Sequence, residues 1–128
     1  MQSHTNFIQA VLSQFPDLGE SIAFDDGLPY NEMGTFASFT QEAKNAENWE
    51  VYERAVQLVA KFLPLADEEL RNEIHVSFLE HLDFEEPNGL KTWRLLPTNL
   101  QRAWHEIIEY DERLIGRPWV NTKYKVAE

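Results

Sequence analysis

The sequence predicts an all-α fold, a compact bundle of about five helices in one domain that spans residues 1–128. Three observations support this prediction. Apolar residues recur at helical spacing in several segments, capping residues and prolines mark the ends of those segments, and no segment alternates convincingly as a strand would. A chain of 128 residues with eight Phe, four Trp and four Tyr is also able to bury a sizeable core.

The first predicted helix has Ser3 or Thr5 as its candidate N-cap and is closed by Pro16. Its apolar stripe consists of Phe7, Ile8, Val11, Leu12 and Phe15. Residues 17–32 follow, with five acids, no base and the turn-forming run Asp25-Asp26-Gly27. We expect this segment to be a long surface loop.

Two helices are predicted in the middle of the chain. Thr35 is the candidate cap of a shorter helix that carries Phe36 and Phe39 and ends near residues 44–45. A stronger helix begins near Glu47 or Asn48 and is stopped by Pro64. Its apolar face consists of Tyr52, Ala55, Val56, Val59, Phe62 and Leu63.

Asp67 is the predicted N-cap of the next helix, because two glutamates follow in the first turn, where the helix dipole favours negative charge. One face of this helix carries Leu70, Ile74, Phe78 and Leu82. Residues 83–89 form an acidic connection that contains Pro, Asn and Gly. Residues 90–96, around Trp93, fit either an extended segment or a turn of helix, and we leave them unassigned.

The clearest amphipathic helix starts at the capping-box spacing of Thr98 and Gln101 and runs to residue 115, before Gly116 and Pro118. Asp111 falls inside its apolar stripe, so we expect either a structural ion pair with an arginine or fraying of the helix before this point. The candidate arginines are Arg94, Arg102 and Arg117. Residues 119–128 allow one short strand or a segment that lies on the surface.

The formal net charge is -11, and it is unevenly distributed. Residues 1–90 hold 17 acids and 4 bases, whereas residues 91–128 hold 5 acids and 7 bases. This charge opposes binding to nucleic acid phosphates and favours a cationic partner. The chain has no cysteine, no signal-peptide pattern and no apolar run long enough to cross a membrane, so we expect a cytoplasmic protein that binds no membrane.

No motif indicates catalysis, a metal or a cofactor. The four histidines, His4, His75, His81 and His105, lack the i,i+3 or i,i+4 spacing of ligands on one helix, and Glu109 stands where an HExxH motif needs histidine. There is no EF-hand, nucleophile elbow or phosphate-binding loop. We therefore predict no enzyme, no metal and no cofactor. The alternative is a small helical enzyme that uses His81 or His105 with a nearby carboxylate.

Aromatic residues next to acids recur outside the apolar stripes, and protein interfaces use aromatic anchors with a charged rim. Any single one of these rings is also suited to packing a loop onto the core. Together with the one-sided charge, the pattern predicts a partner-binding face. Its predicted residues are Asp25, Asp26, Tyr30, Glu32, Asp83, Glu85, Glu86 and Trp93.

Residues 76–84 (VSFLEHLDF), Trp93 and residues 95–104 (LLPTNLQRAW) resemble small helical bacterial proteins of the contact-dependent growth inhibition immunity class. The resemblance covers roughly the C-terminal half and rests on core residues and helix boundaries. It implies a cytoplasmic antidote that binds and blocks a toxin domain, often a nuclease. The alternative is an adaptor or regulatory protein that binds a basic partner without inhibiting an enzyme.

Overall fold

The computed structural model describes residues 1–84, 87–115 and 124–127, with the backbone alone for 109–115. These residues form seven α-helices and no sheet, so the all-α prediction is confirmed and the predicted number of about five helices is too low. The β-structure of this part is limited to an isolated parallel bridge between Gln2 and Ala66. The strand suggested for the tail is not seen at 124–127, and residues 119–123 lie outside the described part.

The surface loop predicted for residues 17–32 is wrong. Helix α1 (His4–Gln14), capped by Ser3, leads through the 3-10 turn η1 (Pro16–Leu18) into the short helix α2 (Gly19–Phe24). Helical structure in residues 16–24 is favoured because Leu18 and Ile22, four positions apart, both pack into the core. The reversal of the chain is confined to residues 25–28, where Asp26 and Gly27 adopt positive φ of 52° and 73°.

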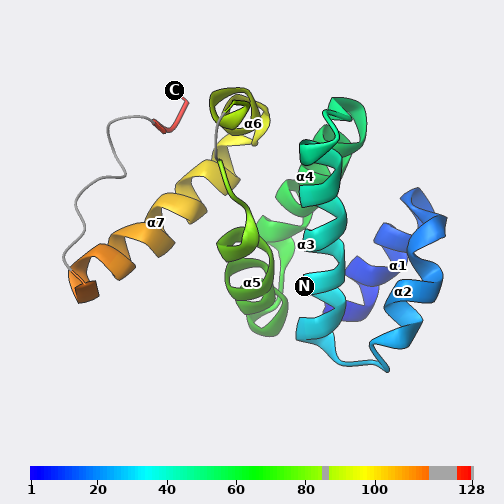
Figure 1. Cartoon of the computed structure of the whole chain (residues 1–128). Helices are drawn as coiled ribbons and strands as arrows, with labels where there is room; N and C mark the ends of the chain where they lie inside the picture. The colour runs from blue at the N-terminus through cyan, green and yellow to red at the C-terminus, as the bar shows by residue number, and fades with distance from the viewer. Residues whose placement is uncertain (85–86, 116–123, 128) are drawn as a thin grey trace.

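Helix α3 (Pro29–Asn45) starts earlier than predicted, so Thr35 lies inside the helix and is not its cap. Pro29 occupies the first turn, where a missing backbone N–H costs nothing. The helix is central, because it contacts α1, α2, α4 (Trp49–Phe62) and α5 (Glu68–Glu73), as Figure 1 shows. Its Phe36 ring packs 5.7 Å from the rings of both Phe7 and Phe78.

The start signals of α4 and α5 are confirmed. The side chain of Asn48 accepts a hydrogen bond from the backbone N–H of Val51, and Asp67 accepts one from Leu70 at 2.8 Å. Helix α5 continues into the π-turn η3 (Ile74–Phe78) and the 3-10 turn η4 (Leu79–His81). The predicted apolar face of this run is buried along its whole length.

The unassigned segment forms helix α6 (Gly89–Leu95), and α7 (Thr98–Ile115) has the predicted extent. The predicted capping box does not form, because Gln101 is buried and bonds other segments. It donates to the Trp93 carbonyl at 2.9 Å and accepts from the Ala127 N–H at 2.8 Å. The side chain of Asp111 lies outside the described residues.

An aromatic cluster holds the C-terminal segment against α6 and α7. Phe84 packs edge to face on Trp93 and on Trp104, each at 5.2 Å, and the Tyr124 ring lies 5.5 Å from Phe84. The Trp93 indole donates to the Lys125 carbonyl at 2.7 Å. Residues 124–127 therefore lie back beside α6 (Figure 1).

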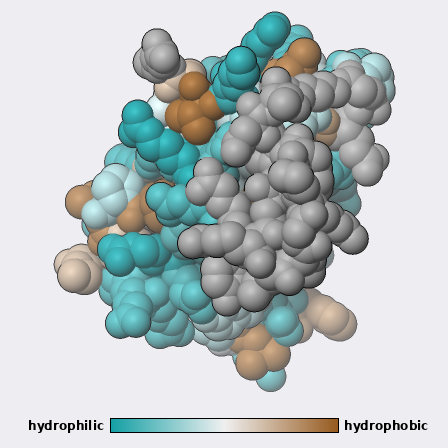
Figure 2. All heavy atoms as spheres, turned by 90° about the vertical axis from the view of Figure 1, so that its left-hand side faces the viewer, coloured by the Kyte–Doolittle hydropathy of each residue, from teal (hydrophilic) through white to brown (hydrophobic). Residues whose placement is uncertain are grey.

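The described helices include none with the length and apolar character that a membrane crossing requires. Figure 2 shows the side of the molecule on the left of Figure 1. Hydrophilic side chains dominate the described part of this face, and hydrophobic ones occur in small separate groups. Among the described residues, the large hydrophobic side chain with the highest exposure after the terminal Met1 is that of Phe24, on α2.

Candidate functional site

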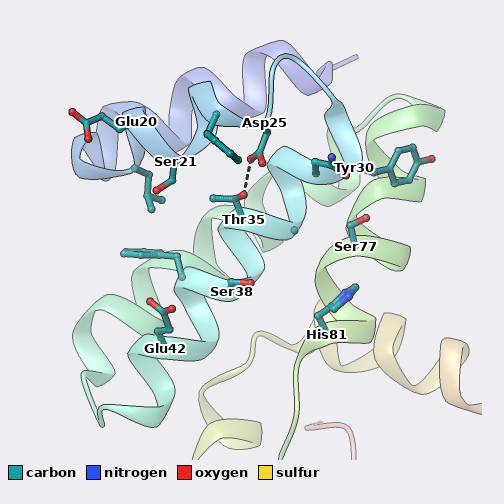
Figure 3. A pocket seen from close by; sticks show the side chains of 14 residues that line it. Glu20, Ser21, Asp25, Tyr30, Thr35, Ser38, Glu42, Ser77 and His81 are labelled. Atoms are coloured by element: carbon teal, nitrogen blue, oxygen red, sulfur yellow. Dashed lines mark hydrogen bonds between the residues drawn. The ribbon is translucent and has the colours of Figure 1, made fainter.

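An open groove of about 1040 Å³ runs along α3, and we call it the α3 groove (Figure 3). Helix α2 forms one wall, and the η3 and η4 turns form the other. The residues that line it are Leu18, Glu20, Ser21, Phe24, Asp25, Tyr30, Asn31, Gly34, Thr35, Ser38, Phe39, Glu42, Ser77 and His81.

The floor of the groove is one stripe of α3. Asn31, Thr35, Ser38 and Glu42 recur at spacings of three and four, so they share one face of the helix. Other faces of α3 carry residues such as Phe36 that are buried in the core. The sequence thus makes α3 apolar where it packs and small or polar where it lines the groove.

The groove is acidic and has an exposed aromatic rim. Glu20 and Asp25 line it from the α2 side, and Glu42 lies at the other end of the floor. The described lining residues include no lysine or arginine. The Thr35 hydroxyl donates to an Asp25 carboxylate oxygen at 2.6 Å. Phe24 is 89% exposed, an unusual state for a phenylalanine side chain in a folded domain.

A smaller hollow of about 640 Å³ adjoins the groove at Tyr30, which lines both. Tyr30 is 41% exposed, and its hydroxyl accepts a hydrogen bond from the Asn72 amide at 2.6 Å. This bond ties the N-terminal end of α3 to α5. The aromatic rim at Tyr30 is therefore held in place by a second helix.

The predicted partner-binding residues do not all lie at one site. Asp25 and Tyr30 line the α3 groove, and Asp26 is exposed on the adjoining turn. Glu32 is not among the lining residues of the groove and bonds His4. Glu85 and Glu86 lie outside the described residues.

The prediction that Trp93 is part of the partner-binding face is wrong. Only 2% of the residue is exposed, because it lies within the aromatic cluster of α6, α7 and residues 124–127, and its indole N–H is already bonded. A tryptophan next to charged residues in sequence fits both an exposed anchor and a core residue. Here the core interpretation is correct, and Trp93 offers no surface to a partner.

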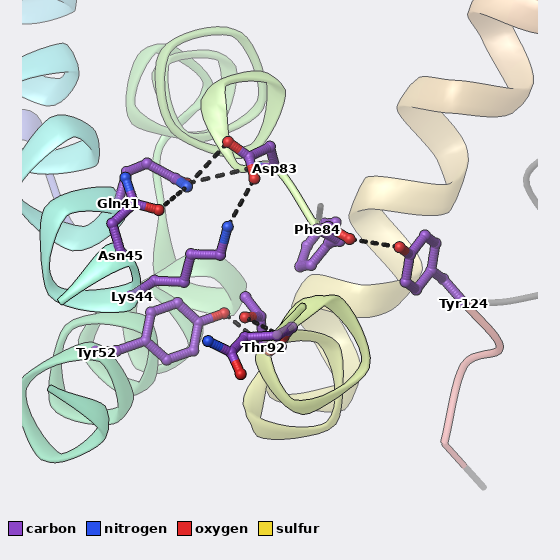
Figure 4. A network of polar contacts seen from close by, with 9 residues as sticks. Gln41, Lys44, Asn45, Tyr52, Asp83, Phe84, Thr92 and Tyr124 are labelled. Carbon is purple, nitrogen blue, oxygen red and sulfur yellow. Dashed lines mark hydrogen bonds and ion pairs between the residues drawn. The ribbon is translucent and has the colours of Figure 1, made fainter. Parts of the chain in front are cut away.

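Asp83 belongs to a polar network that joins α3 to the end of η4 (Figure 4). Its carboxylate accepts from the Lys44 ammonium at 2.7 Å and from the Gln41 amide at 3.0 Å. Nearby, the Tyr52 hydroxyl donates to the Thr92 carbonyl at 2.9 Å, and burial raises the pKa of Tyr52. Asp83 thus has a structural role, with a carboxylate that is partly exposed.

A buried ion-pair cluster, which no pattern in the sequence indicates, joins α1, α3 and α5. The two ring nitrogens of His4 face two carboxylates: Nε2 is 2.7 Å from Glu32 Oε1, and Nδ1 bonds Glu73 Oε1. His4 and Glu32 are 13% exposed, and Glu73 is fully buried. We call these three residues the His4 cluster.

The His4 cluster requires one proton beyond the neutral imidazole. A neutral ring has one N–H and donates to one carboxylate, so the second bond needs a further proton, on the ring or on one of the two carboxylates. Burial raises the pKa of Glu73 above its ordinary value of 4.5, and the neighbouring Glu69 and Asp67 add to the rise while His4 opposes it. Its other oxygen, Oε2, is buried and has no hydrogen-bond partner among the described residues.

Glu73→Gln should flatten the dependence of stability on pH. The raised pKa means that folded Glu73 keeps its proton at pH values where the unfolded chain has lost it. Stability therefore falls as pH rises from about 4.5 through the folded pKa, and glutamine removes this loss. The measurement is the free energy of unfolding in urea at pH 4 to 8. As the pH rises, this free energy should fall less for Glu73→Gln than for the wild type. Glu68→Gln, an exposed change on the same helix, should leave the wild-type profile unchanged, and the same profile for Glu73→Gln would contradict this prediction.

The two histidines of the enzyme hypothesis lie in different surroundings. His81 is exposed at the groove, whereas His105 packs against Trp93 and Trp104 and bonds the Tyr124 carbonyl. Neither bonds a carboxylate within the part of the chain that the structure describes, and no cluster there has the arrangement of a metal site. The described histidine with carboxylate partners is His4, whose ring nitrogens are both engaged.

Comparison with known proteins gives a family without a described function. The sequence model of the family described as "Domain of unknown function (DUF7674)" matches residues 8–111. No curated protein and no solved structure matches the chain significantly. The matched range extends from α1 into α7 and includes the whole α3 groove. The chain therefore belongs to the DUF7674 domain family.

Proposed function

We propose that this protein is an immunity-type binding protein that neutralises a toxin domain by covering its basic site with the α3 groove. The observation that carries the proposal is the groove itself, where three carboxylates and the exposed Phe24 surround a floor of small polar residues. In this proposal the complex forms in the cytoplasm. The resemblance in residues 76–104 supports the inhibitory role.

Electrostatics favour a basic partner at this surface. Glu20, Asp25 and Glu42 line the groove without a lysine or arginine among the described lining residues, and the whole chain carries a formal charge of -11. Such a field speeds the encounter with a cationic surface and penalises anionic competitors. A nuclease site that holds phosphates is one cationic surface of this kind.

The aromatic rim supports a protein partner over a small ion. Phe24 is 89% exposed and Tyr30 is 41% exposed, and both line the groove. Leu28, which is 55% exposed, lies in the turn between them. Interfaces concentrate binding energy in a few aromatic anchors that become buried on association. Exposed apolar side chains beside carboxylates provide the centre and the charged rim of such an interface.

The second candidate function is a non-inhibitory adaptor that binds a basic protein through the same groove. The same acids and the same aromatic rim favour this interpretation. These residues determine whether the partner binds, and they do not determine whether binding inhibits it. The distinction lies in the partner's activity. A partner isolated from the native host should be assayed with and without the purified protein.

Two double variants of equal charge change test the groove. Glu20→Lys with Glu42→Lys should weaken binding to the isolated partner by about tenfold or more. Each substitution removes a carboxylate that attracts the basic partner and adds a lysine that repels it. Glu50→Lys with Glu106→Lys alters exposed residues outside the groove and changes the net charge by the same amount. This control should change the affinity by about threefold or less at moderate salt.

Binding measured by surface plasmon resonance and partner activity measured in parallel separate the outcomes. Loss of binding and loss of inhibition together, in the groove variant alone, support the proposal. Binding without any effect on the partner's activity supports the adaptor. Equal weakening by both double variants would show that net charge, and not the groove, controls the interaction.

A further inference from the structure

The length of the α3 groove and the small side chains of its floor suit the binding of a helix. Its floor extends from Asn31 to Glu42, about three helical turns or about 16 Å. The side chains that project from the middle of this stripe, Thr35 and Ser38, are small, and Gly34 has none. Figure 3 shows Thr35, Ser38 and Glu42 following one another along α3, between α2 and the segment that carries Ser77 and His81.

Gly34 is not explained by packing inside the chain. Glycine inside a helix weakens the helix relative to alanine. A Cβ atom added at Gly34 would meet nothing within 4 Å, so no segment that the structure describes excludes a side chain there. Gly89 is the opposite case, because a Cβ would lie 2.0 Å from the Phe84 carbonyl oxygen. The open space above Gly34 lies in the groove and lets another backbone approach α3 closely.

The π-turn η3 contributes to the opposite wall. Ser77 lies within η3 and lines the groove, although Ile74 and Phe78 of the same turn point into the core. π-turns inside helical runs occur frequently at functional sites. This turn places another small polar side chain beside the floor.

The lining specifies the chemistry of the occupant. Leu18, Phe24 and Phe39 offer apolar contacts, while Glu20, Asp25 and Glu42 offer carboxylates. A helix with an apolar strip and lysine or arginine beside it matches both sets. A peptide added as a strand has no sheet edge to join among the described residues, because their β-structure is the bridge of Gln2 with Ala66.

We propose that the α3 groove seats a basic amphipathic helix of the partner protein, which packs over Gly34. The helix directs its lysine and arginine side chains to Glu20, Asp25 and Glu42. This inference rests on the proposed function and names the segment that the partner supplies. It also explains why the floor carries glycine and small hydroxyl side chains in a helix that is otherwise well packed.

Three labelled synthetic peptides of about 18 residues, each about 27 Å long as a helix, test the occupant by fluorescence anisotropy. The first has lysines beside a leucine strip at helical spacing, the second has glutamates in place of the lysines, and the third scrambles the first. The first should bind at least about tenfold more tightly than either of the others. Its binding should shift the amide NMR signals of α2 and of residues 31–42. Equal binding of the first and the scrambled peptide, or no binding of the first, would overturn the helical occupant.

Gly34→Leu tests the close approach without a loss of folding. Leucine favours the helix, and a Cβ at this position meets none of the described atoms within 4 Å, so the Tm should equal or exceed that of the wild type. The side chain fills the space over α3, so affinity for the first peptide and for the isolated partner should fall by about tenfold or more. Gln57→Leu adds an exposed leucine on α4, outside the groove, and should leave both affinities unchanged.

The two proposals fail separately. If Glu20→Lys with Glu42→Lys weakens partner binding but Gly34→Leu does not, the groove function stands and the helix packed over Gly34 is wrong. If the groove double variant leaves partner binding unchanged, the proposed function fails. Binding of the basic peptide alone would then show a site that the natural partner does not use.

Discussion

His4→Ala should lower the free energy of unfolding by about 3 kcal/mol, because it removes the bridge between two buried or half-buried carboxylates. Glu73 would then have both oxygens buried without a partner, since Oε2 already lacks one. It would have to take up a proton or open to solvent, and either change costs stability. For a domain of this size the Tm should fall by roughly 10 °C.

Differential scanning calorimetry at neutral pH measures this loss. His81→Ala is the matched control, because His81 is exposed and its replacement should change the Tm by little. The double variant His4→Ala with Glu73→Gln should recover part of the lost stability, because the buried carboxylate is gone. A His4→Ala protein as stable as the His81→Ala protein would show that the His4 cluster contributes no net stabilisation.

Gly89→Ala should lower the free energy of unfolding by a similar amount, about 3 kcal/mol, through overpacking. An alanine Cβ would lie 2.0 Å from the Phe84 carbonyl oxygen and 2.9 Å from its carbon, so the backbone must move. That oxygen also accepts a hydrogen bond from the Tyr124 hydroxyl (Figure 4). The displacement should therefore disturb the aromatic cluster of Phe84, Trp93, Trp104 and Tyr124.

Chemical unfolding followed by tryptophan fluorescence checks this prediction, and near-UV circular dichroism reports the cluster directly. Gly34→Ala is the control, because its Cβ meets nothing and should stabilise α3 by about 0.5 to 1 kcal/mol. Opposite effects of the same substitution at the two glycines would separate internal packing from free space. A Gly89→Ala protein with wild-type stability and an unchanged aromatic signal would contradict the close approach.

The sequence predicted best those helices whose boundaries depend on neighbouring residues. Ser3, Asn48 and Asp67 each cap a helix within three residues of their own position, so the signal is local. The loop predicted for residues 17–32 was wrong. The acids and turn-forming residues there indicated an exposed segment, although Leu18 and Ile22 are buried. Two buried residues in a short helix give too weak a period to be distinguished from a loop.

The candidate site was only partly predictable for a related reason. Asp25, Asp26 and Tyr30 are on or beside the groove, because exposed acids and aromatics around a tight turn project outward. The His4 cluster had no sequence signal, since His4 and Glu73 are 69 positions apart. The groove floor had one local signal in the sequence. This signal is the small or polar face of α3, which includes Gly34 and Ser38.

The sequence by itself determined the all-α class, the acidic character of the first ninety residues and most helix boundaries, because these follow from local periodicity, capping and composition. Only the tertiary structure decided that Trp93 is buried while Phe24 is exposed, that Glu32 and Glu73 share His4, and that α3 keeps one polar face uncovered. The physical reason is that burial and charge pairing depend on which distant segments meet. Residue type and local spacing are the same for an anchor on the surface and for a ring in the core.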